Sequence, residues 1–92
     1  MAMTADEIQN ACGGLRGWDA DLNVPSITRD YQFPNFVAAV RFVDFVAELA
    51  EAADHHPDID IRYNRVRLTL STHSAGGVTE KDFALARAID QG

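Results

Sequence analysis

The sequence predicts an α+β fold in which helices pack on one face of a four-stranded antiparallel sheet. Amphipathic helical patterns occur near both ends of the chain and in its centre. Two pairs of strand-like segments, each joined by a short turn, lie between them. No strand-helix-strand unit repeats with the regularity of a Rossmann chain, so the order αββαββα favours an antiparallel sheet.

The size and charge of the chain limit its class. With 92 residues it is expected to form one domain, residues 1–92, around one small core. Such a core often gains stability from a partner subunit, so we expect a homo-oligomer. Eight Lys and Arg residues against fourteen Asp and Glu residues give a net charge of −6, which argues against direct nucleic-acid binding.

The sequence also indicates where the protein resides and limits what its cysteine can do. No apolar run approaches the roughly 18–20 residues that a membrane span needs. The N-terminus, MAMTADEIQN, lacks the basic and apolar stretches of a signal peptide. Cys12 is the only cysteine, which excludes an internal disulfide and a thiolate zinc site. We therefore expect a cytoplasmic protein that is not associated with a membrane.

The first helix and the first two strands follow from local signals. Residues 4–7, Thr-Ala-Asp-Glu, form a capping-box pattern, and Gly13-Gly14 ends the helix that follows. Residues 17–33 are expected to form two strands joined by a turn at residues 23–25. Arg29 shares the apolar face of the second strand, where its stem can pack while its head reaches water or a carboxylate.

The long central helix is the clearest element. It is expected to begin after the N-cap residue Asn35 and to end at about Ala53. Phe42 and Phe45 widen its apolar face beyond what one sheet requires, which indicates either deep burial or a subunit contact. The side chains expected on its core-facing side are Phe36, Val40, Val43, Val46, Leu49 and Ala50.

A β-hairpin and a last helix complete the chain. A two-residue turn at Asn64-Arg65 would pair three sets of apolar residues on one face: Tyr63 with Val66, Ile61 with Leu68, and Ile59 with Leu70. The same register sets Arg62 opposite Arg67, so we expect solvent or a nearby acid there. The residues Thr79-Glu80-Lys81-Asp82 form another cap pattern, at the start of the last helix.

The histidines are the main candidates for chemistry. His55 and His56 follow the long helix and His73 follows the last strand, and the hairpin register brings these two points together at one end of the sheet. Imidazole exchanges protons near neutral pH, and Glu51, one helical turn before His55, can orient a ring. No familiar ligand spacing such as His-x-x-x-His accompanies them, so we expect no metal. Surface-loop histidines and a purely capping Asp82 are the structural alternatives.

The spacing of these residues resembles the signature of the pterin-4a-carbinolamine dehydratases. The matching positions cover roughly residues 15–90. Ser74 stands where the family commonly has Asp, which puts the environment of His73 in question. The positions that carry the resemblance are Glu51-x-x-x-His55-His56-Pro57, Tyr63, His73 and Asp82, with Trp18, Arg29-x-Tyr31-x-Phe33-x-x-Phe36, Val66-x-Leu68-x-Leu70, Thr72-His73 and Gly76-Gly77-Val78-Thr79 around them.

The resemblance implies an αββαββα fold, with dimers formed by sheet extension and often tetramers built from them. It implies dehydration of 4a-hydroxytetrahydropterin to quinonoid dihydropterin, the recycling step that follows the aromatic amino-acid hydroxylases. The pterin is then the substrate, and no metal or redox cofactor is implied.

The resemblance also assigns roles to residues. His55 and His73 would be the acid/base pair, and His56 would bind substrate and assist. Four further residues would bind substrate or support these histidines: Glu51, Asp54, Thr72 and Asp82. The alternative function is a non-catalytic binding or assembly module, because some relatives act as dimerisation cofactors or enzyme-assembly factors. A pure scaffold has no physical need for three acid/base groups at one point, which favours the enzyme.

Overall fold

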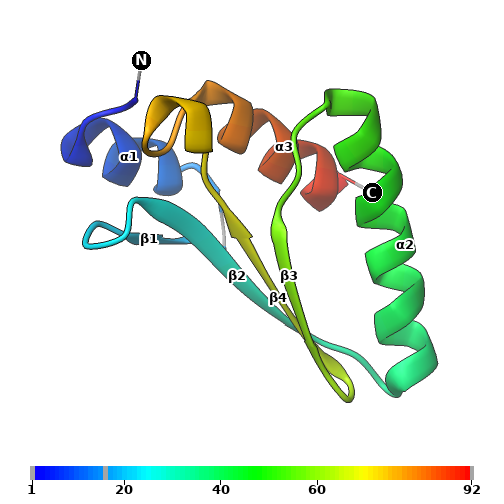
Figure 1. The fold of residues 1–92 in the computed structure, drawn as a ribbon. Helices are drawn as coiled ribbons and strands as arrows, with labels where there is room; N and C mark the ends of the chain where they lie inside the picture. Colours follow the sequence, from blue (N-terminus) through cyan, green and yellow to red (C-terminus); the bar gives the residue numbers. More distant parts are fainter. Residues whose placement is uncertain (1, 16, 92) are drawn as a thin grey trace.

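A computed structural model, which describes residues 2–15 and 17–91, has the predicted order of elements (Figure 1). Among these residues no helix is both long enough and apolar enough to cross a membrane. The elements are α1 (Ala5–Cys12), β1 (Asp19–Asp21), β2 (Ser26–Gln32), α2 (Phe36–Ala53), β3 (Asp58–Arg62), β4 (Arg65–Leu70), the short 3₁₀ helix η1 (His73–Ala75) and α3 (Glu80–Gln91).

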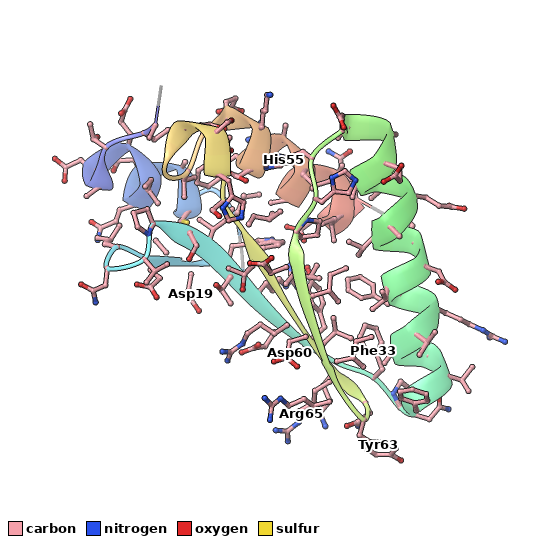
Figure 2. The ribbon with its side chains drawn as sticks, viewed as in Figure 1. Asp19, Phe33, His55, Asp60, Tyr63 and Arg65 are labelled. Atoms are coloured by element: carbon pink, nitrogen blue, oxygen red, sulfur yellow. The ribbon has the colours of Figure 1, made fainter. Side chains whose placement is uncertain are left out.

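The four strands form one sheet in the order β1-β2-β4-β3, and every neighbouring pair is antiparallel. Alternate residues of β2 and β4 face the helices, as the period of two in a strand requires; those of β4 and Ile27 of β2 are buried, whereas Arg29 and Tyr31 are partly buried. The helices cover this face, whereas the opposite face carries charged side chains (Figures 1 and 2). The core side chains that the sheet contributes are Ile27, Val66, Leu68 and Leu70.

Both predicted helix starts in the first half of the chain are confirmed. Thr4 Oγ1 accepts a hydrogen bond from Glu7 N–H at 3.2 Å, and a Glu7 side-chain oxygen accepts from Thr4 N–H at 2.8 Å. Asn35 Oδ1 accepts from Ala38 N–H at 2.9 Å and caps α2. These bonds satisfy backbone donors that the first turn of a helix leaves without partners.

The packing of α2 differs from the prediction at its first turn. Phe36 was expected to face the core, but it is 50% exposed. The first buried residue of α2 is Ala39. Phe42, in contrast, packs against the rings of both Tyr31 and Phe33, with centroid distances of 4.5 and 5.1 Å. Phe42, one of the residues that widen the apolar face of α2, is therefore packed against the end of β2 in the same chain.

The hairpin register differs from the predicted one by two residues. The turn consists of Tyr63-Asn64, and Ile61 pairs with Val66 and Ile59 with Leu68. Tyr63 is therefore not paired with Val66; it takes the left-handed turn position, with φ 54°, and is 69% exposed. Since a shift of two residues keeps every side chain on its face, the apolar face was nevertheless predicted correctly.

Contacts with β2 explain the observed register. Arg67 lies opposite Asp30 on one side and Asp60 on the other, instead of opposite Arg62. Its guanidinium donates to both carboxylate oxygens of Asp30, at 2.7 and 3.1 Å, and Arg67 holds the pKa of Asp30 below its usual value. Asn64 Nδ2 also donates to the Phe33 carbonyl at 2.9 Å, which fixes the turn against the end of β2.

A polar cluster joins the last turn of α3 to the sheet. Trp18 is buried, and its indole N–H donates to Asp90 Oδ2 at 3.0 Å. Arg29 donates to Asp90 Oδ1 at 2.9 Å, and its guanidinium carbon lies 4.7 Å from the centroid of the Tyr31 ring. The expectation that Arg29 packs its stem and finds a carboxylate is confirmed.

The Tyr31 hydroxyl is buried without a well-formed hydrogen bond to any residue that the structure describes, although Asp90 lies near enough to interact with it. Burial raises the pKa of Tyr31 to about 12, and Asp90 adds to the rise while Arg29 opposes it. Because the pKa in the folded state lies above that of the unfolded chain, this group destabilises the fold as the pH rises from about 10 towards 12.

Replacing Tyr31 with Phe is therefore expected to keep or raise stability at neutral pH, by up to about 1 kcal/mol. Above about pH 10 the variant should become more stable still relative to wild type. In wild type the Tyr31 hydroxyl ionises more readily in the unfolded chain than in the folded one and so favours unfolding, and Phe has no such group. Urea unfolding at pH 7 and pH 11 measures both effects. A variant less stable than wild type at both pH values would show that the hydroxyl has a partner.

Candidate functional site

The three histidines meet in one cavity of about 260 Å³ at the end of the sheet opposite the hairpin turn. Figure 2 shows His55 where the chain leaves α2 for β3, far from Tyr63 at the turn. The predicted convergence of the histidines is thus confirmed. The lining residues are Asp54, His55, His56, Ser71, Thr72, His73 and Ser74.

The end of α2 determines where His55 points. The helix stops at Ala53, and Asp54 adopts a left-handed conformation with φ 50° and ψ 43°. His55 N–H then donates to the Ala50 carbonyl at 3.1 Å, a bond that spans the helix end as in a Schellman motif. The chain therefore turns sharply, and His55 no longer lies on the helix face that carries Glu51.

His55 pairs with Asp82 in the first turn of α3. Nε2 of His55 lies 2.5 Å from Oδ1 of Asp82. The His55 side chain is 11% exposed and that of Asp82 is 0% exposed, so this pair is shielded from water. A carboxylate at one ring nitrogen orients an imidazole and leaves its other nitrogen for proton transfer.

The second carboxylate oxygen of Asp82 accepts two hydrogen bonds. Thr72 Oγ1 donates to Oδ2 at 2.9 Å, and the Thr79 backbone N–H donates to the same atom at 2.9 Å. Asp82, the third residue of α3, therefore caps the backbone of Thr79 at the helix start and also pairs with His55, so the two interpretations of the sequence are not exclusive. Thr72 is itself buried beside it.

His56, not His55, pairs with Glu51. His56 Nε2 lies 2.6 Å from Glu51 Oε1. The prediction that Glu51 would orient His55 was wrong, because the helix does not continue beyond Ala53. The side chains of this second pair are 57% and 78% exposed, so water screens it far more than the buried pair.

His73 is held by a small closed loop. It begins η1 directly after Thr72, and Thr72 N–H donates to the Gly77 carbonyl at 2.7 Å while Gly77 N–H donates back to Thr72 at 3.3 Å. Gly76 closes the loop with φ 70°, a value that favours glycine. The bridge between residues 72 and 77 thus fixes the segment that carries His73 and Ser74 at the cavity.

The site can transfer protons at several points. Among the described residues no group of three or more His, Cys, Asp or Glu side chains is arranged to hold a metal ion. The arrangement combines one shielded histidine–aspartate pair, one exposed histidine–glutamate pair and a third histidine on a separate loop.

Two parts of the site were missed from the sequence. Thr79 was expected only as a helix cap, yet its hydroxyl lies 2.8 Å from that of Thr72 and extends the network around Asp82. Ser71 also lines the cavity. The Ser71-Thr72-His73-Ser74 run was the available signal, because hydroxyl residues on both sides of a histidine are frequent hydrogen-bond partners.

The chain matches a family model described as "Pterin 4 alpha carbinolamine dehydratase" over residues 1–92. The chain belongs to this pterin dehydratase family. Two relatives carry the provisional name pterin-4-alpha-carbinolamine dehydratase. One, from Chloroflexus aurantiacus, is 65% identical over 74 residues, which are 80% of this chain and 77% of the relative. The other, from Acidobacterium capsulatum, is 54% identical over 88 residues, or 96% and 94% of the two chains.

Solved structures of the pterin dehydratase type agree with the fold. A crystal structure described as a transcriptional coactivator/pterin dehydratase from Brucella melitensis matches with a TM-score of 0.93 and 40% identity, over 99% of this chain and 97% of that one. A pterin dehydratase-like protein identified as a RuBisCO assembly factor matches with a TM-score of 0.70 and 23% identity, over 84% and 89% of the chains. The second likeness supports the fold alone.

The buried and the exposed pair should contribute very differently to stability. Asp82→Ala removes a carboxylate with three partners, so the free energy of unfolding should fall by about 3–5 kcal/mol. Glu51→Ala removes one exposed partner and should cost less than about 1 kcal/mol. Urea unfolding of the two variants measures this contrast. Equal losses would contradict the difference in burial.

Proposed function

We propose that the protein dehydrates 4a-hydroxytetrahydropterin to quinonoid dihydropterin by histidine acid/base catalysis. The convergence of three histidines from two separated segments into one cavity carries this proposal. Membership of the pterin dehydratase family supports the same substrate class.

The reaction needs two proton transfers. The C4a hydroxyl receives a proton and leaves as water when the C–O bond breaks, and N5 of the pterin loses a proton. In the proposed roles His55 and His73 are the acid/base pair, and His56 binds the substrate and assists. Positioned acid/base groups of this kind contribute roughly 10²–10⁴-fold each. Since elimination of water changes no overall oxidation state, the proposal invokes no redox cofactor or metal.

The supporting residues have distinct proposed tasks. Asp82 holds His55, and Thr72 holds Asp82, through the hydrogen bonds described above. Glu51 orients His56, and Asp54 lines the cavity where it can contact the substrate. Ser74 cannot supply the charge that an acid would place next to His73, so we propose that His73 works without a carboxylate on its own loop.

A larger concavity on the other face of the sheet is a weaker candidate for the active site. It measures about 520 Å³ and lies among the arginines and aspartates of β2, β3 and β4. It contains no histidine, and no side chain there has an ordinary pKa near neutrality. The smaller cavity is therefore the better match for proton transfer at neutral pH.

The proposed place of this reaction is tetrahydropterin recycling, downstream of an aromatic amino-acid hydroxylase that forms the 4a-hydroxypterin. The functional partner is then the enzyme that supplies the substrate.

Turnover of a 4a-hydroxytetrahydropterin by the purified protein tests this function. His55→Gln and His73→Gln keep a polar side chain but cannot exchange protons near neutral pH, so each should lower kcat by roughly 10²–10⁴-fold. Arg65→Ala, in the larger concavity on the outer sheet face, is the control and should leave kcat unchanged. A wild-type rate no faster than buffer would reject the enzyme and leave the binding or assembly module as the remaining function.

We also propose that the active protein is a homodimer or homotetramer. β3 is an edge strand, and its Ile59 and Ile61 are each 38% exposed although they lie on the apolar face of the sheet. An unpaired edge of this kind can extend the sheet into a second copy.

Light scattering at micromolar concentration should therefore give at least twice the chain mass of 10.1 kDa. Ile61→Lys should reduce that mass, because a charge on the edge strand opposes strand pairing. Val24→Lys, at a residue that is 70% exposed before β2, is the matched control and should leave the mass unchanged. A monomeric wild type would overturn the proposal.

A further inference from the structure

We infer that Asp82 holds His55 in the tautomer that carries its proton on Nε2, so that Nδ1 is the atom that exchanges protons with the substrate. Asp82 is then a positioning residue, and Thr72 and Thr79 position it in turn. The inference concerns which atom of His55 works, and its catalytic consequence rests on the function proposed above.

The first step is the state of Asp82 Oδ2. The Thr79 backbone N–H can only donate, and it donates to Oδ2 at 2.9 Å. Thr72 Oγ1 donates to the same oxygen at 2.9 Å. An oxygen that accepts two hydrogen bonds carries no proton of its own, so a proton shared by Asp82 and His55 can lie only in the contact between Oδ1 and Nε2.

The second step is the direction of the hydroxyl chain. Thr72 has one hydroxyl hydrogen, and it points to Asp82. In the 2.8 Å contact between Thr72 and Thr79, Thr79 must therefore be the donor. Thr79 Oγ1 in turn accepts from Lys81 N–H at 3.3 Å. The chain of donors runs from the backbone of α3 through both threonines to Asp82, and no hydroxyl hydrogen remains free to reverse it.

The third step concerns the remaining oxygen, Oδ1. It lies 2.5 Å from Nε2 of His55, so one hydrogen lies between the two atoms. Because imidazole is ordinarily a stronger base than a carboxylate, we place this hydrogen on Nε2, which in a neutral imidazole leaves Nδ1 without one. His55 is 11% exposed, whereas the His56–Glu51 pair is open to solvent, so only His55 has its tautomer preset by a shielded partner.

Asparagine at position 82 gives a sharp test. Because the two donors at Oδ2 select the amide oxygen for that place, the amide NH₂ would have to face Nε2 of His55. An NH₂ group donates, so Nε2 would lose its hydrogen and His55 would take the Nδ1–H tautomer. Asp82→Asn should therefore reverse the tautomer while keeping both hydrogen bonds to Thr72 and Thr79.

The tautomer can be read by two-dimensional ¹H–¹⁵N NMR of protein labelled with ¹⁵N-histidine, at about pH 8, where ordinary imidazole is neutral. We expect His55 to be Nε2–H in the wild type and Nδ1–H in Asp82→Asn. Asp44→Asn, which makes the same charge change at an exposed position of α2, is the control and should keep the wild-type tautomer. In the dehydratase assay Asp82→Asn should lower kcat with little change in KM, since the ring stays in place.

An Nδ1–H tautomer in the wild type would overturn the inference. So would an Nε2–H tautomer in folded Asp82→Asn. The wild-type spectrum alone decides the first point if the variant does not fold. Because the spectra need no substrate, a wild type without dehydratase activity would reject the proposed function while the tautomer is still measured.

Discussion

Asp82 is the one charged side chain that the described structure buries completely, and its hydrogen bonds connect three parts of the fold. A buried charge is costly unless partners satisfy it. The partners come from the end of α2 through His55, from the end of β4 through Thr72, and from the start of α3 through Thr79. Satisfying one carboxylate therefore fixes how these segments meet, and the cavity with the three histidines forms where they do.

A second electrostatic contact fixes the sheet that leads to this point. Arg67 lies in one row between Asp30 and Asp60, and this row sets β4 against both of its neighbours. Each pair is exposed and weak by itself, yet a slip of two residues would move Asp60 away from Arg67 and set Arg62 there instead; in the observed register Arg62 lies opposite Arg65, next to the turn. The register then determines that the end of β4 returns beside the end of α2, where His73 meets His55 and His56.

The fold class and most element boundaries could be predicted because they depend on local signals. The caps at Thr4 and Asn35 and the alternation in β2 act within a few residues. The meeting of the histidines was also predictable, since any antiparallel hairpin returns to its starting end. The turn itself was misplaced because Asn64 is held by Phe33, a residue distant in sequence, and no local propensity encodes that contact.

The sequence by itself determined the αββαββα order, the apolar face of the sheet and the set of histidines that share one end of it. Only the tertiary structure decided which carboxylate serves which histidine. The spacing in the sequence predicted that Glu51 would pair with His55. The left-handed conformation of Asp54 redirects the chain, so that Glu51 pairs with His56 and Asp82 pairs with His55. The physical reason is that a helix end can rotate a neighbouring side chain to another face, and a partner from α3 is specified only once the chain is packed.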